Sequence, residues 1–164
     1  QHNFIDLVLE CKPTQVTLVP DAIGALTSNA GWDTIKHQSY LIEVIQEFQR
    51  NGIRTSIFVD ADEKMIEGAK ATGTERIELY TESFAHEYGL GNKNGIKPFI
   101  KAAIKANELN IGINAGHDLS MDNIKFFKEN IPNLLEVSIG HALISESLYL
   151  GLENVVNMYL QKLK

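Results

Sequence analysis

Strand-like and helix-like segments alternate along the whole chain, and this alternation limits the fold more than any other feature. Short runs rich in β-branched and apolar residues predict five strands, at residues 15–20, 54–60, 76–81, 110–114 and 136–140. Between them, apolar residues recur at the 3.6-residue spacing of a helix, as they do over residues 40–48. Such a series of βα units predicts an α/β protein with a parallel sheet.

Two α/β architectures accommodate five units of this kind. One is a five-stranded doubly wound sheet, for which 164 residues are sufficient. The other is the last five βα units of a (β/α)8 TIM barrel, with three strands upstream of Gln1. The helical pattern over residues 3–11 favours the barrel, because it is the second half of a unit whose strand would precede it. We therefore expect residues 1–164 to be a single domain, the C-terminal part of a TIM barrel from which the upstream units are absent.

Composition narrows the classes of partner. The net charge of −6 and the pI of about 5.3 argue against binding to nucleic acid or to an anionic membrane. The four lysines at positions 93, 97, 101 and 105 recur every four residues and predict a solvated helix face. A single cysteine, Cys11, forms no internal disulfide, which fits a reducing, cytoplasmic location. We expect Cys11 to be a small buried hydrophobic residue rather than a nucleophile.

The first candidate site is the segment Asn114-Ala115-Gly116-His117, which follows the fourth predicted strand. Ligands bind at the carboxyl ends of the strands in both architectures. A glycine before the histidine allows a close backbone approach to a ligand, and a histidine exchanges protons near neutral pH. The structural alternative is a histidine that only caps a helix or completes a loop. The position of His117 at a predicted strand end favours a role in proton transfer over this alternative by a small margin.

The second candidate site is the pair Gly140-His141, which follows the fifth predicted strand. A short apolar helix over residues 142–150 comes next, and Gly151 opens a final helix. A strand, a glycine and a short extra helix are the elements of the phosphate site of a TIM barrel, where backbone N–H groups at the helix start bind the anion. An ordinary turn before a helix explains the pair equally well.

Other polar positions carry weaker signals. Thr27 and Ser28 lie in a small-residue loop, whose hydroxyls could bind a sugar phosphate but are also common in turns. Asp60 and Asp62 are better explained as helix caps than as metal ligands. No lysine ends a predicted strand, and neither a Gly-x-Gly-x-x-Gly motif nor a P-loop is present, so the sequence supports no Schiff base and no nucleotide site.

The ordered set of motifs resembles the pyridoxine 5'-phosphate synthase family. The resemblance runs from about residue 5 to the end of the chain and is most specific in Asn114-Ala115-Gly116-His117-Asp118-Leu119 and Ser138-Ile139-Gly140-His141-Ala142. Shorter matches lie at residues 15–20, 26–28, 31–33, 56–60 and 77–81. The resemblance implies an eight-stranded barrel that condenses 1-deoxy-D-xylulose 5-phosphate with 3-amino-2-oxopropyl phosphate. Pyridoxine 5'-phosphate, phosphate and water are the implied products, and no metal or organic cofactor takes part.

The resemblance also assigns roles to residues. His117 corresponds to the family's proton donor, and Gly140 with His141 corresponds to the pair that binds the phosphate of the product. The other correspondences are a substrate-binding threonine, Thr27; a strand carboxylate that faces the barrel mouth, Glu78; and a ligand-binding position, Asp118. Position 118 is often glycine in the family, so only its backbone role transfers.

The chain also departs from the family pattern. The catalytic histidine and glutamate and most substrate-binding residues of the family's first three strands have no counterpart in it, so we expect the 164 residues alone to be inactive. We also expect a homo-oligomer, and an open half-barrel needs upstream residues or partners to cover its strand edges. Two alternatives remain: another phosphate-binding TIM-barrel isomerase or lyase, and a non-catalytic flavodoxin-like binding module.

Overall fold

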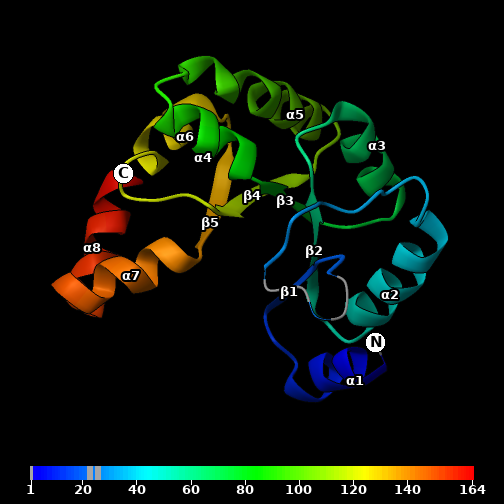
Figure 1. Cartoon of the computed structure of the whole chain (residues 1–164). Helices are drawn as coiled ribbons and strands as arrows, with labels where there is room; N and C mark the ends of the chain where they lie inside the picture. Colours follow the sequence, from blue (N-terminus) through cyan, green and yellow to red (C-terminus); the bar gives the residue numbers. More distant parts are fainter. Residues whose placement is uncertain (1, 22–23, 25–26) are drawn as a thin grey trace.

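Five parallel strands form one sheet, and their order in space follows their order in the sequence. The computed structural model describes residues 2–21, 24 and 27–164 (Figure 1). The strands are β1 (Gln15–Leu18), β2 (Arg54–Val59), β3 (Arg76–Tyr80), β4 (Gly112–His117) and β5 (Leu134–Ile139). Each strand pairs in parallel with the next one. A doubly wound sheet would reverse its strand order at a switch point, so the flavodoxin-like alternative is wrong.

The sheet curls, and the helices lie around its outer side (Figure 1). This is the architecture of a partial (β/α) TIM barrel, as the sequence predicts. The helices are α1 (His2–Cys11), α2 (Gln38–Arg50), α3 (Glu63–Ala71), α4 (Glu82–Gly89), α5 (Lys97–Glu108), α6 (Ile124–Asn130), α7 (His141–Leu150) and α8 (Leu152–Lys162), with a 3-10 turn η1 (Lys93–Ile96). None of the helices within the described part of the chain is long and apolar enough to cross a membrane.

Apart from shifts of one or two residues at strand ends, the predicted elements differ from the observed ones in two places. The helix α4 and the turn η1 were not expected, because α4 buries only Phe84 and therefore shows no apolar repeat. The strand β4 continues three residues beyond its predicted end at Asn114, through Ala115 and Gly116 to His117. Pairing with β5 extends it, since His117 lies opposite Ile139 in the register. The first candidate site thus belongs to the strand itself.

The apolar core lies between the outer side of the sheet and the helices. Alternate strand residues such as Ile57, Ile77 and Ile113 are fully buried there. They meet the apolar faces of the helices, which include Leu41 and Phe48 of α2. The other strand residues point to the concave side, which in a complete barrel is the interior.

Helix capping explains Asp62, as predicted, but it does not explain Asp60. The carboxylate of Asp62 accepts hydrogen bonds from the backbone N–H groups of Lys64 and Met65, at 2.8 and 3.2 Å, and begins α3. The carboxylate of Asp60 instead accepts a hydrogen bond from the N–H of Gly31 at 3.3 Å, which ties the loop after β1 to the end of β2.

The prediction for Cys11 is wrong. Its side chain is exposed, whereas Val8, one turn earlier in α1, is buried. Cys11 is the last residue of the helix, and Lys12 next to it has a positive φ of 46° at the point where the chain leaves the helix. The apolar stripe of α1 therefore ends before Cys11, and the described segments do not cover the thiol.

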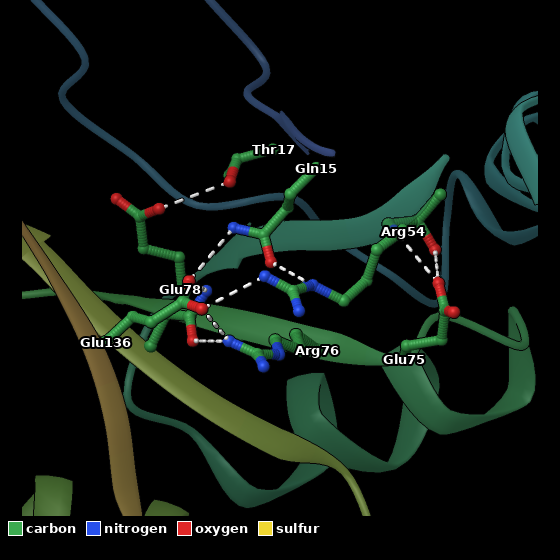
Figure 2. A network of polar contacts seen from close by, with 9 residues as sticks. Gln15, Thr17, Arg54, Glu75, Arg76, Glu78 and Glu136 are labelled. Carbon is green, nitrogen blue, oxygen red and sulfur yellow. Dashed lines mark hydrogen bonds and ion pairs between the residues drawn. The ribbon is translucent and has the colours of Figure 1, made fainter. Parts of the chain in front are cut away.

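A charged layer occupies the concave side at the starts of the strands (Figure 2). Its centre is Glu136 of β5, whose Oε1 lies 2.6 Å from Nη1 of Arg76 and 3.0 Å from Nη2 of Arg54. Gln15 of β1 donates to the second oxygen of Glu136 at 3.4 Å and accepts from Nε of Arg54 at 2.8 Å. Asn114 of β4 also donates to Glu136, at 3.3 Å. The layer thereby links β1 to β5 across the sheet.

Replacing Glu136 by glutamine tests this layer. Burial acts to raise the pKa of Glu136, but the hydrogen bond and charge of Arg76, together with the charge of Arg54, hold it below its usual value. We expect E136Q to lower the free energy of unfolding by about 1 kcal/mol at pH 7. Hydrogen bonds to a charged group stabilise more than exposed ion pairs do, but Glu136 is 42% exposed, so solvent screens part of the effect. Urea denaturation of both proteins measures the difference in free energy.

The stability that the ionised Glu136 contributes should decrease as the pH falls. A lowered folded-state pKa stabilises the protein above the unfolded pKa, and this contribution is lost as the pH falls through the folded pKa. The loss in E136Q should therefore shrink in acid. A matched control is E129Q, because Glu129 makes only an exposed contact of 3.8 Å with Lys125. An equal loss at every pH would contradict the account.

Candidate active site

His117 lies at the carboxyl end of β4, with its imidazole ring against two aromatic side chains that also contact each other. The ring centroid is 5.6 Å from that of Phe58 of β2 and 5.8 Å from that of Tyr80 of β3. Its Nδ1 lies 2.9 Å from Oδ2 of Asp118. Its Nε2 is buried and has no hydrogen-bond partner among the described residues. The side chain is 27% exposed, so part of it is open to solvent although Nε2 itself is covered.

Gly116 allows the backbone before His117 to pack directly against β5. A Cβ atom at Gly116 would stand 2.3 Å from the carbonyl oxygen of Ser138, which is far inside van der Waals contact. On the other side, the hydroxyl of Thr81 donates to the carbonyl of Gly116 at 2.7 Å and accepts from the N–H of Asp118 at 3.3 Å. The segment that carries the histidine is therefore fixed from both neighbouring strands.

Gly140 joins the second candidate site to the first. Its N–H donates to the carbonyl oxygen of His117 at 3.1 Å, and a Cβ at Gly140 would stand 3.0 Å from the same oxygen. The helix α7 begins with His141, and Gly140 is its N-cap. Because the N–H of Gly140 is already engaged, the backbone donors that the helix start offers to a ligand begin at His141 and Ala142.

An open pocket of about 360 Å³ lies between these two strand ends. Its walls combine the two Gly-His segments with the first turn of α4, and its lining residues are Glu82, Ala85, His86, His117, Asp118, His141 and Ala142. His86 lies outside the strand ends from which candidates were chosen, so sequence reasoning missed it. Glu82 and His86 are four residues apart and share one face of α4. This spacing indicates a shared site only once residues 82–89 are recognised as a helix.

Glu78 lies in the middle of β3, and its side chain is on the concave side. The residue is 8% exposed, and burial raises the pKa of its carboxyl group, while a hydrogen bond from Thr17 and the charge of His117 act in the opposite direction. The hydroxyl of Thr17 donates to Oε2 of Glu78 at 3.3 Å. A carboxyl group of this kind exchanges protons at a higher pH than an exposed one does.

Thr27 lies apart from the other candidates. It is exposed in the loop after β1, and among the described residues it makes no hydrogen bond to the strand ends that carry His117 and Gly140. Leu26, which belongs to the same sequence motif, lies outside the described residues. The loop returns to the sheet at Trp32, whose N–H donates to the carbonyl of Phe58 at 2.8 Å and whose indole donates to that of Leu18 at 3.1 Å.

The carboxyl ends of β2, β3 and β4 form an acidic rim around Tyr80. Burial raises the pKa of Tyr80, and the nearby carboxylates of Asp118, Glu82 and Asp60 raise it further. Sequence reasoning missed Phe58 and Tyr80, which contact the ring of His117. The available signal was their alternation with core residues such as Ile57 and Leu79 along β2 and β3. No group of three or more potential metal ligands comes together within residues 2–21, 24 and 27–164.

Comparison with known proteins gives one consistent result. A family model described as pyridoxal phosphate biosynthesis protein PdxJ matches residues 1–164. The chain is 82% identical over 164 residues to a protein named pyridoxine 5'-phosphate synthase from Flavobacterium johnsoniae. The match covers 100% of this chain and 69% of the relative. It is 67% identical over 163 residues to a protein of the same name from Christiangramia forsetii, covering 99% of this chain and 69% of the relative.

A first prediction concerns Gly116. The substitution G116A should destabilise the protein by about 1–3 kcal/mol, because the added methyl group forces β4 and β5 apart. The control is G89A, since nothing lies within 4 Å of a Cβ at Gly89. Thermal unfolding of both variants measures the difference. A melting temperature of G116A equal to that of G89A would show that the two strand ends separate without cost.

A second prediction concerns Glu78. A raised folded-state pKa means that the folded protein binds the proton more tightly, so this group's contribution is greatest below the unfolded pKa and is lost as the pH rises through the folded pKa. Glutamine cannot ionise, so E78Q should raise the melting temperature at pH 8 and change it little in acid. The control E10Q alters an exposed carboxylate and should do neither. A lower melting temperature of E78Q at pH 8 would contradict the burial argument.

Proposed function

The chain belongs to the family of pyridoxal phosphate biosynthesis protein PdxJ, and we propose that it acts as a pyridoxine 5'-phosphate synthase. The substrates are 1-deoxy-D-xylulose 5-phosphate and 3-amino-2-oxopropyl phosphate, and the products are pyridoxine 5'-phosphate, phosphate and water. The observation that carries the proposal is the position of His117 at the strand end, with a buried Nε2 that has no hydrogen-bond partner among the described residues. Two relatives with this name at 82% and 67% identity support it.

The reaction requires repeated proton transfers, and two side chains of the concave side suit them. Ring closure between an amine and ketones proceeds through imine formation and dehydration, and each of these steps moves a proton. The imidazole of His117 is a side chain of the type that most often serves as a general acid or base. The raised pKa of Glu78 keeps a proton on its carboxyl group to a higher pH than in an exposed glutamate, so Glu78 assists as a second acid–base group. Neither role needs a metal or an organic cofactor.

The phosphate of the product binds at the start of α7 in this proposal. His141 and Ala142 line the pocket and are the first two residues of a ten-residue helix, so its dipole and its free backbone N–H groups favour an anion there. Gly140 has no side chain and therefore lets β4 and β5 approach, and its N–H donates to the carbonyl of His117 rather than to the ligand. Two of the carboxylates around Tyr80, those of Glu82 and Asp118, line the same pocket, and they repel a phosphate from their side of it towards the start of α7. The ligand is thereby oriented.

Three further assignments belong to the proposal. The backbone of Asp118 borders the pocket and contributes to ligand binding. Thr27 is exposed and accessible, and its hydroxyl binds a substrate. The protein is a cytoplasmic homo-oligomer that binds neither nucleic acid nor membranes, and an apolar surface on α7 supports its self-association, since Leu148 is 81% and Tyr149 90% exposed.

Replacing His117 by asparagine tests the function. In the protein as its gene encodes it, H117N should lower the rate of pyridoxine 5'-phosphate formation by at least about 100-fold, since general acid–base groups contribute roughly this much or more. The assay supplies both substrates and quantifies the product by mass. The control is H37N, because His37 precedes α2, contacts Trp32 and is not among the residues that line the pocket.

Two results would contradict the assignment. Unchanged turnover in H117N would remove His117 from the chemistry. A different product formed from the two substrates would favour another phosphate-binding barrel enzyme, such as an isomerase or a lyase.

A further inference from the structure

We propose that Asp118 is a positioning residue for His117: its carboxylate holds the proton of the neutral imidazole on Nδ1 and leaves Nε2 as the nitrogen that acts on the substrate. The inference rests on the proposed function, because it specifies which atom of His117 moves the proton. It concerns the side chain of Asp118, whereas the family resemblance concerns only the backbone at this position.

The contact between the two side chains is short, and both backbones are fixed. Oδ2 of Asp118 lies 2.9 Å from Nδ1 of His117. The N–H of Asp118 is bonded to Thr81 on one side, and the carbonyl of His117 accepts from Gly140 on the other. An exposed ion pair between flexible side chains contributes little. Here the neighbouring strands hold both residues in place, so the carboxylate can orient the ring.

The contact determines which ring nitrogen carries the proton. A carboxylate only accepts hydrogen bonds, so Nδ1 must donate, and in the neutral ring Nε2 then has the free lone pair. Nε2 is buried and has no partner among the described residues. A buried polar atom without a partner is costly to the folded state, and such atoms often belong to functional sites. A substrate group that hydrogen-bonds Nε2 removes this cost.

None of the other titratable side chains near His117 hydrogen-bonds its ring in the described part of the chain. The titratable groups nearby are Glu78 and Tyr80 of β3, Glu82 and His86 of α4, and His141 of α7. Within the described part of the chain, Asp118 is the one side chain that hydrogen-bonds the ring of His117. Phe58 and Tyr80 flank the ring and limit its rotation. The ring orientation therefore depends on one carboxylate and two aromatic contacts.

Asp118 has no role in starting the next helix. The helix α6 begins at Ile124, after the N-cap Asn123, whose side chain accepts from the N–H of Ser120 at 2.9 Å. Replacing the carboxylate of Asp118 therefore leaves the capping of α6 intact. An effect on turnover then reports on His117 rather than on local unfolding.

The substitution D118N is the kinetic test. An asparagine amide can donate to Nδ1 and thereby favour the opposite tautomer. In the protein as its gene encodes it, we expect kcat for pyridoxine 5'-phosphate formation to fall about 10–100-fold, as on removal of other side chains that orient a functional histidine, while KM stays close to that of the parent. The control D122N changes an exposed carboxylate of the same loop and should leave kcat unchanged.

A second variant separates positioning from a general structural effect. Because Asp118 acts through His117, the double variant H117N/D118N should be no slower than H117N alone. Additive losses would mean that Asp118 acts on its own, and they would overturn the inference. An unchanged kcat in D118N would also overturn it.

Nitrogen-15 NMR of the histidine rings tests the tautomer without any turnover. The parent protein should show the His117 proton on Nδ1, and D118N should move it to Nε2. If the parent forms no pyridoxine 5'-phosphate, the proposed function fails, yet the spectrum still reports on the contact between Asp118 and His117. The same tautomer in the parent and in D118N would overturn the positioning role.

Discussion

The close approach of the ends of β4 and β5 is the constraint on which the whole site depends. Two glycines make it possible: a side chain at Gly116 would overlap the carbonyl of Ser138, and one at Gly140 would press on that of His117. The hydrogen bond from Gly140 to His117 then connects the two strand ends directly. One backbone contact thus sets the distance between the proposed acid–base histidine and the proposed phosphate-binding helix start.

Polarity is layered along the concave side of the sheet. At the strand starts, Glu136 joins Arg54 and Arg76 in a charged layer that links the first and last strands (Figure 2). Above it lies the buried carboxyl group of Glu78, and at the strand ends the ring of His117 packs against two aromatic side chains. Barrel enzymes in general separate stability at the strand starts from chemistry at the strand ends, and the site proposed for this chain follows the same division.

Much of the fold followed from local patterns in the sequence. Most of the helices were predicted because they bury one regular face, as α2 does through Leu41, Val44 and Phe48. The helix α7 was predicted from its apolar composition, yet none of its residues is buried. The choice between a barrel and a doubly wound sheet needed the strand order, which periodicity does not encode. The helix α4 was missed because it buries a single side chain, Phe84. The prediction that Cys11 is buried was wrong, since Cys11 lies at the end of the helix and not within its apolar stripe.

The site was less predictable than the fold. Both Gly-His pairs could be selected, because their places at strand ends are visible in the sequence. The contacts that hold His117, from Thr81, Phe58 and Tyr80, depend on the register between strands, which the sequence alone does not provide. The roles of His117, Asp118, Gly140, His141, Glu78 and Thr27 stay predictions, and the geometry supports them unequally, since Thr27 lies apart.

A crystal structure of the protein with bound pyridoxine 5'-phosphate tests the central claim most directly. The account predicts the phosphate within hydrogen-bonding distance of the N–H groups of His141 and Ala142, with the pyridine ring beside Nε2 of His117. A phosphate held at the ends of other strands, with the ring out of reach of His117, would contradict it.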